Sequence, residues 1–347
     1  MKIGILTSGG DCPGLNAVIR AIVRKGNLMG YQTTGIYNGW KGLFDENYKD
    51  LSVKNVAGIV NRGGTILGTS RFNPFAEKHG KETLLHKVSK EEFDVLIAIG
   101  GEGSMHIAQE AFKLGINVIG VPKTIDNDIS GTDYTFGFDT AVSIATEAID
   151  RLHTTAESHH RIMILEVMGR HAGWIALHSG IAGGADIILI PEFKMSLDEI
   201  NEILMKRYSR GKIFSIIVVA EGAEYLAEEI YEITKTSDKN ARYDEAGRKR
   251  LGGIGNLLAE MIEEKSGFET RATVLGYIQR GGVPTAFDRM LGTRLGIHAV
   301  EMIAEKKFGR MSAVKGNDII DITIEDAIGT LKTVPPELYE EAKVFFN

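Results

Sequence analysis

The sequence has little cysteine and little proline. Its 347 residues include a single cysteine, Cys12, and only 7 prolines. One cysteine cannot form an internal disulfide, which excludes the class of small secreted domains held together by disulfides and fits a reducing compartment. Because no segment is low in complexity either, the composition is not that of a disordered or linker-rich protein.

Long apolar runs and an excess of positive charge are also missing. No apolar run reaches the length of about 18 residues that a membrane helix needs, and Met1 leads directly into a strand-like run rather than a signal peptide. The net charge of −6, from 40 basic and 46 acidic residues, argues against nucleic acid as the main partner. Small phosphates need only a local cluster of cations and backbone N–H groups. We therefore expect a cytoplasmic protein with no nucleic-acid and no membrane partner.

Glycine is abundant, at 41 of 347 residues or about 12%, against a usual share of about 7%. Many of these glycines form Gly-Gly pairs after apolar runs, which is typical of tight turns near ligands. Apolar strand candidates alternate with helix-length segments, so we predict an α/β fold of doubly wound, mostly parallel sheets with helices on both faces. The predicted strands are Lys2–Thr7, Gln32–Tyr37, Asp94–Ile99, Asn117–Val121, Arg161–Val167, Asp186–Ile190, Phe214–Ala220 and Thr270–Leu275.

The segment Pro122–Asp128 carries the strongest chemical signal. It follows the mostly apolar run Ile116–Val121 and places two carboxylates, Asp126 and Asp128, beside a lysine and a threonine. Ligands of parallel sheets bind beyond the carboxyl ends of the strands, where such a loop would lie. Carboxylates next to a core cost free energy, so the pair indicates metal binding, proton transfer or both.

Two glycine-rich turns are candidates for phosphate binding. The first strand ends in Thr7–Gly14, and the third ends in Gly100–Ser104, each before a helix whose N-terminus favours anions. Glu102, inside the second turn, could hold Mg²⁺ against a phosphate chain, or could simply be an acid favoured by the helix dipole. Neither turn has the spacing of the common NTPase or dinucleotide fingerprints. Without a histidine pattern around it, Cys12 is interpreted as a packing residue.

Five motifs together resemble the 6-phosphofructokinase family, in order and in spacing. They are Thr7-Ser8-Gly9-Gly10-Asp11, Gly100-Gly101-Glu102-Gly103, Pro122-Lys123-Thr124-Ile125-Asp126-Asn127-Asp128, Met168-Gly169-Arg170 and Gln279-Arg280-Gly281-Gly282. The similarity extends from Lys2 to about Gly296. It implies Mg²⁺-dependent phosphorylation of the 1-hydroxyl of fructose 6-phosphate, in a homotetramer or homodimer whose substrate site is shared between subunits.

The resemblance also implies roles for individual residues. Asp126 matches the base that takes the hydroxyl proton, and Asp128, Thr124, Arg170, Arg71 and Lys123 complete the implied catalytic set. Nucleotide-binding positions are Gly10, Arg71, Phe72, Gly101, Glu102, Gly103 and Ser104, with Glu102 also at the Mg²⁺ position. Sugar-phosphate positions are Thr124, Ile125, Asp126, Arg161, Met168, Gly169, Arg170, Glu221, Arg271, Tyr277 and Arg280, of which Arg161 and Arg271 would reach the 6-phosphate from a neighbouring subunit. Taken alone, each arginine is more typical of a surface ion pair.

The implied domains follow the family. Residues 1–137 plus about 279–330 would form a nucleotide and Mg²⁺ lobe. Residues 138–278 plus about 331–347 would form a sugar-phosphate lobe, with an insertion near 224–255. Tyr277 stands where the family usually has histidine, so a hydrogen-bond donor is kept there but a positive charge is lost.

The family includes ATP users and pyrophosphate users, and two positions bear on the choice. Pyrophosphate-dependent members resemble this chain at Lys123 but carry aspartate in place of Gly103, where a carboxylate would repel the α-phosphate of a nucleotide. We therefore predict ATP as the donor and keep pyrophosphate as the alternative. A lipid or NAD kinase would lack the Pro122–Asp128 and Met168–Arg170 motifs. A non-catalytic sugar-phosphate or nucleotide sensor would be expected to lose Asp126 or the Gly101–Ser104 turn.

Regulation stays open at the level of the sequence. Arg20, Arg24 and Lys212 match basic positions of the effector site of the bacterial family, and Asp186 stands where glutamate is common. The same residues would equally be ordinary surface charges, so no effector is predicted.

Overall fold

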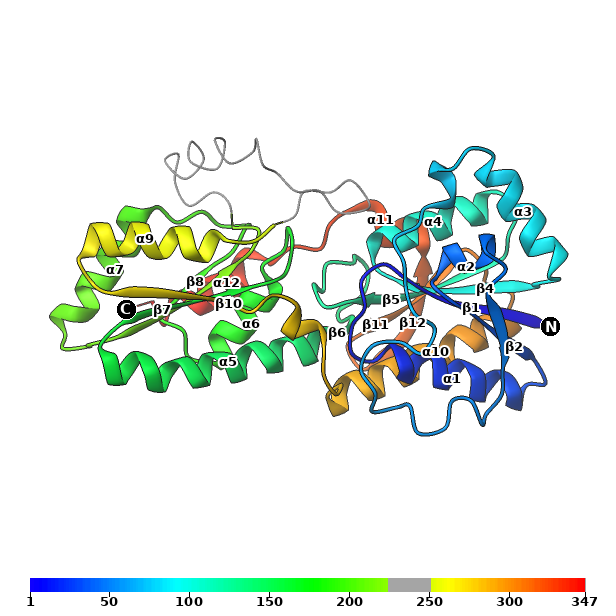
Figure 1. The fold of residues 1–347 in the computed structure, drawn as a ribbon, viewed down its shortest axis with the longest axis horizontal. Helices are drawn as coiled ribbons and strands as arrows, with labels where there is room; N and C mark the ends of the chain where they lie inside the picture. Colours follow the sequence, from blue (N-terminus) through cyan, green and yellow to red (C-terminus); the bar gives the residue numbers. More distant parts are fainter. Residues whose placement is uncertain (224–250, 347) are drawn as a thin grey trace. The chain divides into compact units, whose positions relative to one another are not determined.

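Most strands of the protein form where the sequence has its apolar runs. In a computed structural model, residues 1–223 and 251–346 are described, and they belong to two units (Figure 1). The first unit comprises Met1–Thr140 and Arg280–Leu331, and the second comprises Ala141–Gln279 and Lys332–Asn347. The insertion predicted near 224–255 falls mainly on residues 224–250, which lie outside the described residues.

The sheet of the first unit has eight strands among the described residues, in the order β12-β11-β5-β4-β1-β2-β3, with β6 paired to β5. The inner pairings are parallel, and the edge strands β3 and β12 run antiparallel to their neighbours. The strands are β1 (Lys2–Ser8), β2 (Gln32–Ile36), β3 (Tyr48–Leu51), β4 (Val95–Gly100), β5 (Val118–Thr124), β6 (Phe136–Gly137), β11 (Arg310–Lys315) and β12 (Asp318–Thr323). All six residues of β4 and all seven of β5 are buried, as expected for strands covered on both faces.

Helices cover both faces of this sheet (Figure 1). One face carries α1 (Leu15–Leu28) and α10 (Ala286–Ala304), and the other carries α2 (Trp40–Phe44), α3 (Gly80–Lys90), α4 (Glu102–Lys113) and α11 (Ile324–Gly329). The α1 and α10 backbones approach closely because α10 has glycine at the contact. A Cβ atom on Gly296 would lie 2.8 Å from the carbonyl oxygen of Val18.

The N-terminus of α10 is fixed by a buried polar network around Asp288. The Thr285 hydroxyl caps the helix by accepting the Asp288 N–H, and it donates to Asp139 at 2.6 Å. The Asp288 carboxylate, which is fully buried, accepts both the N–H and the hydroxyl of Thr140. Burial outweighs these hydrogen bonds and raises the pKa of Asp288 to about 6.

This raised pKa predicts a pH-dependent stability difference for Asp288→Asn. A carboxyl whose pKa is higher in the folded state than in the unfolded state makes the folded state less stable as pH rises between the two pKa values. For Asp288 that interval runs from 3.8 to about 6. Asparagine carries no charge and does not titrate. The gap between the free energies of unfolding of variant and wild type should therefore shift in favour of the variant by about 3 kcal/mol at most between pH 4 and pH 7.5. Urea unfolding at both pH values measures the gap. The exposed Asp318→Asn serves as control, and a gap that does not change with pH would contradict the burial argument.

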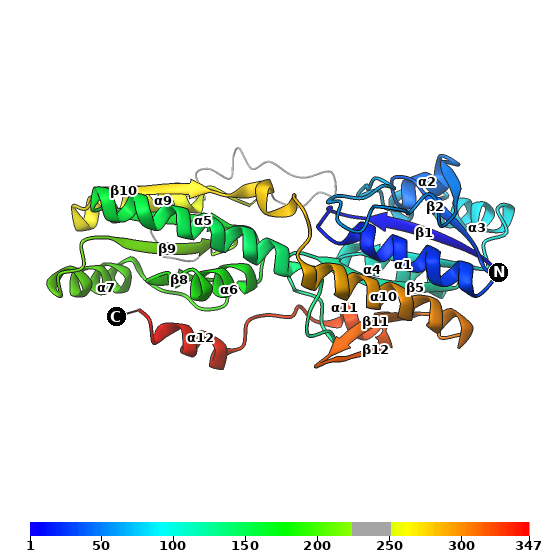
Figure 2. The ribbon, with the colours of Figure 1, turned by 90° about the horizontal axis from the view of Figure 1, so that it is seen from below.

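The second unit is built on a four-stranded, all-parallel sheet in the order β10-β7-β9-β8. Its strands are β7 (Ile162–Val167), β8 (Ile187–Leu189), β9 (Ser215–Ala220) and β10 (Thr270–Val274). On one face lie α7 (Leu197–Ser209) and α9 (Ile254–Ser266), and on the other α5 (Phe138–His159) and α6 (Trp174–Ala182), as Figures 1 and 2 show. The prediction of doubly wound, mostly parallel α/β sheets is confirmed.

The end of the chain returns to the second unit. Its helix α12 (Pro336–Lys343) places Tyr339 against β8, where the tyrosine hydroxyl donates to the Ile188 carbonyl at 2.9 Å. The Trp174 indole N–H donates to the Lys332 carbonyl at 2.9 Å, and Glu192 accepts the Val334 N–H at the same distance. These bonds explain why residues after Leu331 belong to this unit.

A buried carboxylate also joins β7 to α9. Glu166, which is 2% exposed, accepts the N–H groups of Gly253 and Gly255 at 2.8 Å each. It therefore satisfies donors that the first turn of α9 would leave without partners. None of the described helices combines the length and the hydropathy that a membrane span requires.

Candidate active site

The first glycine turn follows β1 and is held by the segment before Arg71. The N–H of Gly9 donates to the Ser70 carbonyl at 2.9 Å, and the Thr69 hydroxyl donates to the Gly9 carbonyl at 2.7 Å. Gly9 has φ +86, a conformation that favours glycine. These two hydrogen bonds join the first glycine turn to the segment around Ser70, at the carboxyl end of β1.

Arg71 and Phe72 come directly after this contact, and both are half-buried. The Phe72 ring packs edge-on against Phe44, with ring centroids 4.9 Å apart, and contacts the hydrophobic core of the unit. Phe72 therefore anchors the segment, and Arg71 lies beside the first glycine turn.

The second glycine turn lies next to the first, because Ser8 of β1 pairs with Gly100 of β4. A Cβ atom on Gly100 would lie 2.2 Å from that of Ser104, so the turn requires glycine there. A Cβ atom on Gly103 would instead meet no other part of the described structure within 4 Å beyond its own helix backbone. Gly101 precedes α4, which begins at Glu102, and the side chain of Glu102 is 50% exposed with His106 Nε2 at 3.6 Å.

The strand before the two aspartates is longer than the sequence indicates. We expected it to end at Val121, but β5 continues through Pro122 and Lys123 to Thr124. On the side away from β4, strand β5 pairs with β11 at Ile119 and Gly120, and then with β6 from Lys123 onward. Pro122 falls between the two partners, where its missing N–H breaks no ladder bond.

Lys123 is buried beneath the first glycine turn and donates a hydrogen bond to the Gly10 carbonyl. Burial lowers the pKa of this lysine, and the neighbouring Arg280 lowers it further, whereas Asp126 and Asp11 act in the opposite direction. The guanidinium of Arg280 lies against the same turn, since a Cβ atom on Gly10 would be 2.5 Å from its Nη1. Two basic side chains therefore contact Gly10.

The loop that carries Asp126 is fixed by its own polar residues. The Thr124 hydroxyl accepts the Asp126 N–H at 3.0 Å, and the Thr135 hydroxyl donates to the Thr124 carbonyl at 2.9 Å. Asn127 adopts φ +52 and accepts the Thr135 N–H at 3.1 Å. This gives Asn127, to which the sequence assigned no role, a positioning function.

The carboxylate of Asp126 is buried in this loop. It is 6% exposed, and its Oδ1 is buried without a hydrogen-bond partner among the described residues. A buried carboxylate oxygen of this kind can accept a hydrogen bond or a proton from a ligand. Neighbouring Ile125 and Asp128 are also buried, at 3% and 9% exposure.

The acidic residues suit a cation that arrives with phosphate. In the described part of the chain, no group of three or more His, Cys, Asp or Glu residues could form a metal cage. Mg²⁺ commonly takes one or two carboxylates and completes its coordination with phosphate oxygens and water. Half-exposed Glu102 fits that pattern, and so does Oδ1 of Asp126, which has no hydrogen-bond partner in the described structure.

The second unit presents another loop at the carboxyl end of β7. Met168 is followed by Gly169 with φ +142 and Arg170 with φ +53. Glu221, directly after β9, accepts the Arg170 N–H at 3.2 Å. A Cβ atom on Gly222 would lie 1.7 Å from the Arg170 carbonyl oxygen, so this approach requires glycine. The structure thus brings together Met168, Gly169, Arg170 and Glu221.

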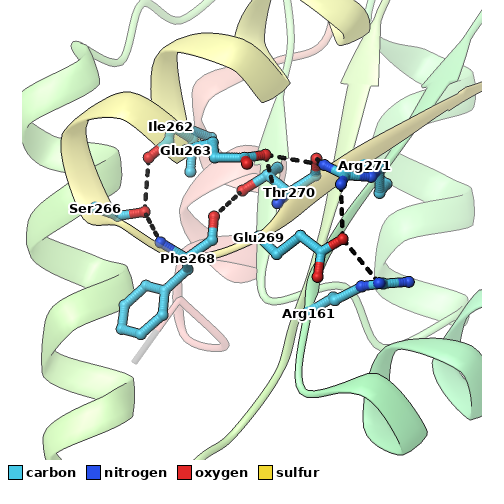
Figure 3. A network of polar contacts seen from close by, with 8 residues as sticks. All are labelled: Arg161, Ile262, Glu263, Ser266, Phe268, Glu269, Thr270 and Arg271. Carbon is cyan, nitrogen blue, oxygen red and sulfur yellow. Dashed lines mark hydrogen bonds and ion pairs between the residues drawn. The ribbon is translucent and has the colours of Figure 1, made fainter.

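Arg161 and Arg271 lie elsewhere in the second unit, near the amino ends of β7 and β10 (Figure 3). Arg161 pairs with Glu269 at 2.7 Å, and Arg271 pairs with Glu269 at 2.6 Å and Glu263 at 2.9 Å. They form a cluster separate from the loop Met168-Gly169-Arg170, called the Arg170 loop below. Tyr277 is 75% exposed in the short helix η3 (Gly276–Arg280).

Sequence reasoning missed a contact between two Arg-Gly-Gly segments. A Cβ atom on Gly63 would lie 2.2 Å from the Gly282 carbonyl oxygen, so the Arg62-Gly63-Gly64 turn touches the segment that follows Arg280. Buried Asn16 holds this turn, donating to the Arg62 carbonyl at 3.0 Å and accepting the Ile66 N–H at 2.9 Å. The similarity of the two triplets was visible in the sequence, but the contact was not.

Asp186, at the position compared with an effector-site glutamate, has a structural partner. Its Oδ1 lies 2.7 Å from Arg207, and its Oδ2 accepts the Ile216 N–H at 2.8 Å. Burial raises the pKa of Asp186 despite these contacts. The carboxylate is thus committed to joining α7 to the edge of the sheet.

These features define a class of protein: a two-unit α/β enzyme with two glycine turns and a carboxylate loop at the carboxyl ends of parallel strands. The sequence model described as phosphofructokinase matches residues 2–303, and this chain belongs to that family. It is 53% identical to a pyrophosphate–fructose 6-phosphate 1-phosphotransferase of Amycolatopsis methanolica over the full length of both. It is 49% identical to ATP-dependent 6-phosphofructokinase 3 of Streptomyces coelicolor over 99% of each.

A solved structure agrees with this assignment. Phosphofructokinase from Saccharomyces cerevisiae is similar at a TM-score of 0.80 and 30% identity. The alignment covers 99% of this chain and 46% of that longer chain.

Proposed function

We propose that this chain is an ATP-dependent 6-phosphofructokinase, which transfers the terminal phosphoryl group of ATP to the 1-hydroxyl of fructose 6-phosphate. The observation that carries the choice of donor is the open space at Gly103. Apart from its chain neighbours and the backbone of its own helix, no atom of the described residues lies within 4 Å of the position of a Cβ there, in the first turn of α4. A nucleotide extends beyond the two phosphates of pyrophosphate and needs uncharged room of this kind.

Asp126 is the proposed base. Its buried Oδ1 lacks a partner among the described residues, so it can accept the hydrogen of the sugar hydroxyl as the oxygen attacks phosphorus. Thr124 fixes the backbone of Asp126 through its hydroxyl. Asp128, two residues further on, belongs to the same proposed group around the transferring phosphoryl.

The phosphate chain would be held by the two glycine turns and their cations. Backbone N–H groups at the start of α4 suit an anion, as does Arg71 beside the first turn, with Phe72 anchoring its segment. Arg280 and Lys123 add positive charge at Gly10. A bound Mg²⁺ would neutralise phosphate charge, and Glu102 with Asp126 or Asp128 would hold it.

The sugar phosphate is proposed to bind the Arg170 loop and a pair of arginines, Arg161 and Arg271. Met168, Gly169, Arg170 and Glu221 suit sugar hydroxyls and phosphate, and Arg170 is the cation of that group. Arg161 and Arg271 are proposed to hold the 6-phosphate of a substrate bound mainly by a neighbouring subunit of a homodimer or homotetramer, and Tyr277 would donate a hydrogen bond. Positioning and charge neutralisation are what phosphoryl transfer chiefly requires.

Pyrophosphate is the second candidate donor, for two reasons. Lys123 brings a cation to the first glycine turn, and relatives named as pyrophosphate-dependent reach 53% identity against 49% for relatives named as ATP-dependent. These two identities differ too little to decide the donor.

A donor assay tests the proposal. Fructose 6-phosphate and Mg²⁺ are supplied with either ATP or pyrophosphate, and formation of fructose 1,6-bisphosphate is followed. We expect turnover with ATP and a much smaller kcat/KM with pyrophosphate. The reverse ratio would establish the pyrophosphate-dependent alternative, and no product with either donor would leave a non-catalytic binding protein.

A further inference from the structure

One carboxylate oxygen joins the two arginines of the second unit. Thr270 of β10 pairs with Ile162 of β7 and Arg271 pairs with Met163, so the register places Glu269 opposite Arg161 and Arg271 two residues further along β10. Oε1 of Glu269 lies 2.7 Å from Nη2 of Arg161 and 2.6 Å from Nη2 of Arg271, as Figure 3 shows. Both guanidinium groups are therefore turned toward a single anionic atom.

The charge of this cluster is balanced without any ligand. Arg271 Nη1 also pairs with Glu263 of α9 at 2.9 Å, so two carboxylates face two guanidinium groups. Hydrogen bonding to Arg161 lowers the pKa of Glu269, which therefore stays ionised at neutral pH. All four side chains remain between 29% and 51% exposed, which leaves them accessible to a solute.

We propose that Glu269 is an affinity-determining residue: its carboxylate occupies the position between Arg161 and Arg271 that a sugar phosphate must take, and the phosphate competes with it. This inference rests on the proposed function, in which these two arginines bind the 6-phosphate. Carboxylate and phosphate oxygens make the same kind of charge-assisted hydrogen bond to guanidinium groups. One bridging anion can therefore replace the other.

Neutralising Glu269 is expected to strengthen phosphate binding, wherever the Glu269 side chain lies after the phosphate binds. If the carboxylate is displaced, its two ion pairs with the arginines are lost on binding, and this loss weakens the affinity for the sugar phosphate. If it stays, it repels the phosphate dianion. In both cases, neutralising Glu269 strengthens the binding of the phosphate.

Glu269→Gln tests the proposal, because glutamine keeps the size of the side chain and removes its charge. We expect the KM for fructose 6-phosphate to fall about fivefold, as suits exposed ion pairs, with kcat unchanged. The matched control is Glu264→Gln, an exposed residue of α9 that removes the same charge from the chain. In an Arg161→Ala background, the effect of Glu269→Gln should shrink, because one of the two bridged cations is gone.

Calorimetric titration with fructose 6-phosphate, without donor, separates this inference from the proposed function. Wild-type protein that binds the sugar phosphate but fails to turn it over would end the proposed function only. A Kd that is unchanged or weaker in Glu269→Gln would overturn the inference, since it would make Glu269 a neutral neighbour or a support that orients the arginines. Equal tightening in Glu264→Gln would also overturn it, because net charge alone would then explain the result.

Discussion

Replacing Asp126 with asparagine is expected to lower kcat by about 10²- to 10⁴-fold, the usual contribution of a general base. The KM for fructose 6-phosphate should change only a few-fold, because the base acts chiefly in the transition state. Asparagine keeps the shape of the side chain and leaves the Thr124 bond to the backbone N–H of residue 126 in place. Steady-state kinetics with the preferred donor measure both constants.

Asp94→Asn is a suitable control for this experiment. Asp94 lies just before β4, at the amino end of the strand and hence away from the glycine turns at its carboxyl end. The same charge is removed there, and kcat should remain near that of the wild type. Asp126→Asn with near-normal turnover would remove Asp126 from the role of base, even if fructose 6-phosphate still binds.

Gly103→Asp is expected to raise the KM for ATP by about a thousandfold. Two like charges about 4 Å apart repel by about 4 kcal/mol at an effective dielectric near 20, which corresponds to that factor in binding. The backbone can accept the substitution, because a Cβ atom at this position would meet none of the described residues within 4 Å beyond its own helix backbone. Initial rates over a range of ATP concentrations measure the change.

Gly103→Asn separates charge from volume, since asparagine has the shape of aspartate without its charge. If repulsion is the cause, the asparagine variant should retain much more ATP use than the aspartate variant. Equal losses in both would mean that the nucleotide needs the space itself. Undiminished ATP turnover in Gly103→Asp would refute the argument for the donor.

Much of the fold could be predicted because its strands are apolar and followed by glycine turns. Runs such as Val95–Gly100 are buried on both faces and can hardly be anything but parallel strands between helices. The hairpin of β11 and β12 was missed. The burial of β12 is only intermediate along most of its length, so its sequence lacks a clear apolar pattern.

The site was predictable as a set of motifs and unpredictable in its contacts. The two glycine turns and the Asp126 loop follow from strands that end at one edge of a sheet. The bond from Lys123 to Gly10 does not, because it depends on β5 continuing past Pro122. The pairing of Arg161 with Glu269 was equally hidden, since these residues are far apart in the sequence and meet only through the register of two strands.

Strand β7 has a consequence that follows from its length alone. Arg161 precedes its first residue, Met168 follows its last, and all six residues between them are buried. An extended segment of this kind does not stretch or shorten, so a displacement at one end is passed on to the other. A ligand that displaces the loop after β7 would therefore also displace Arg161, which lies at the other end of the same strand.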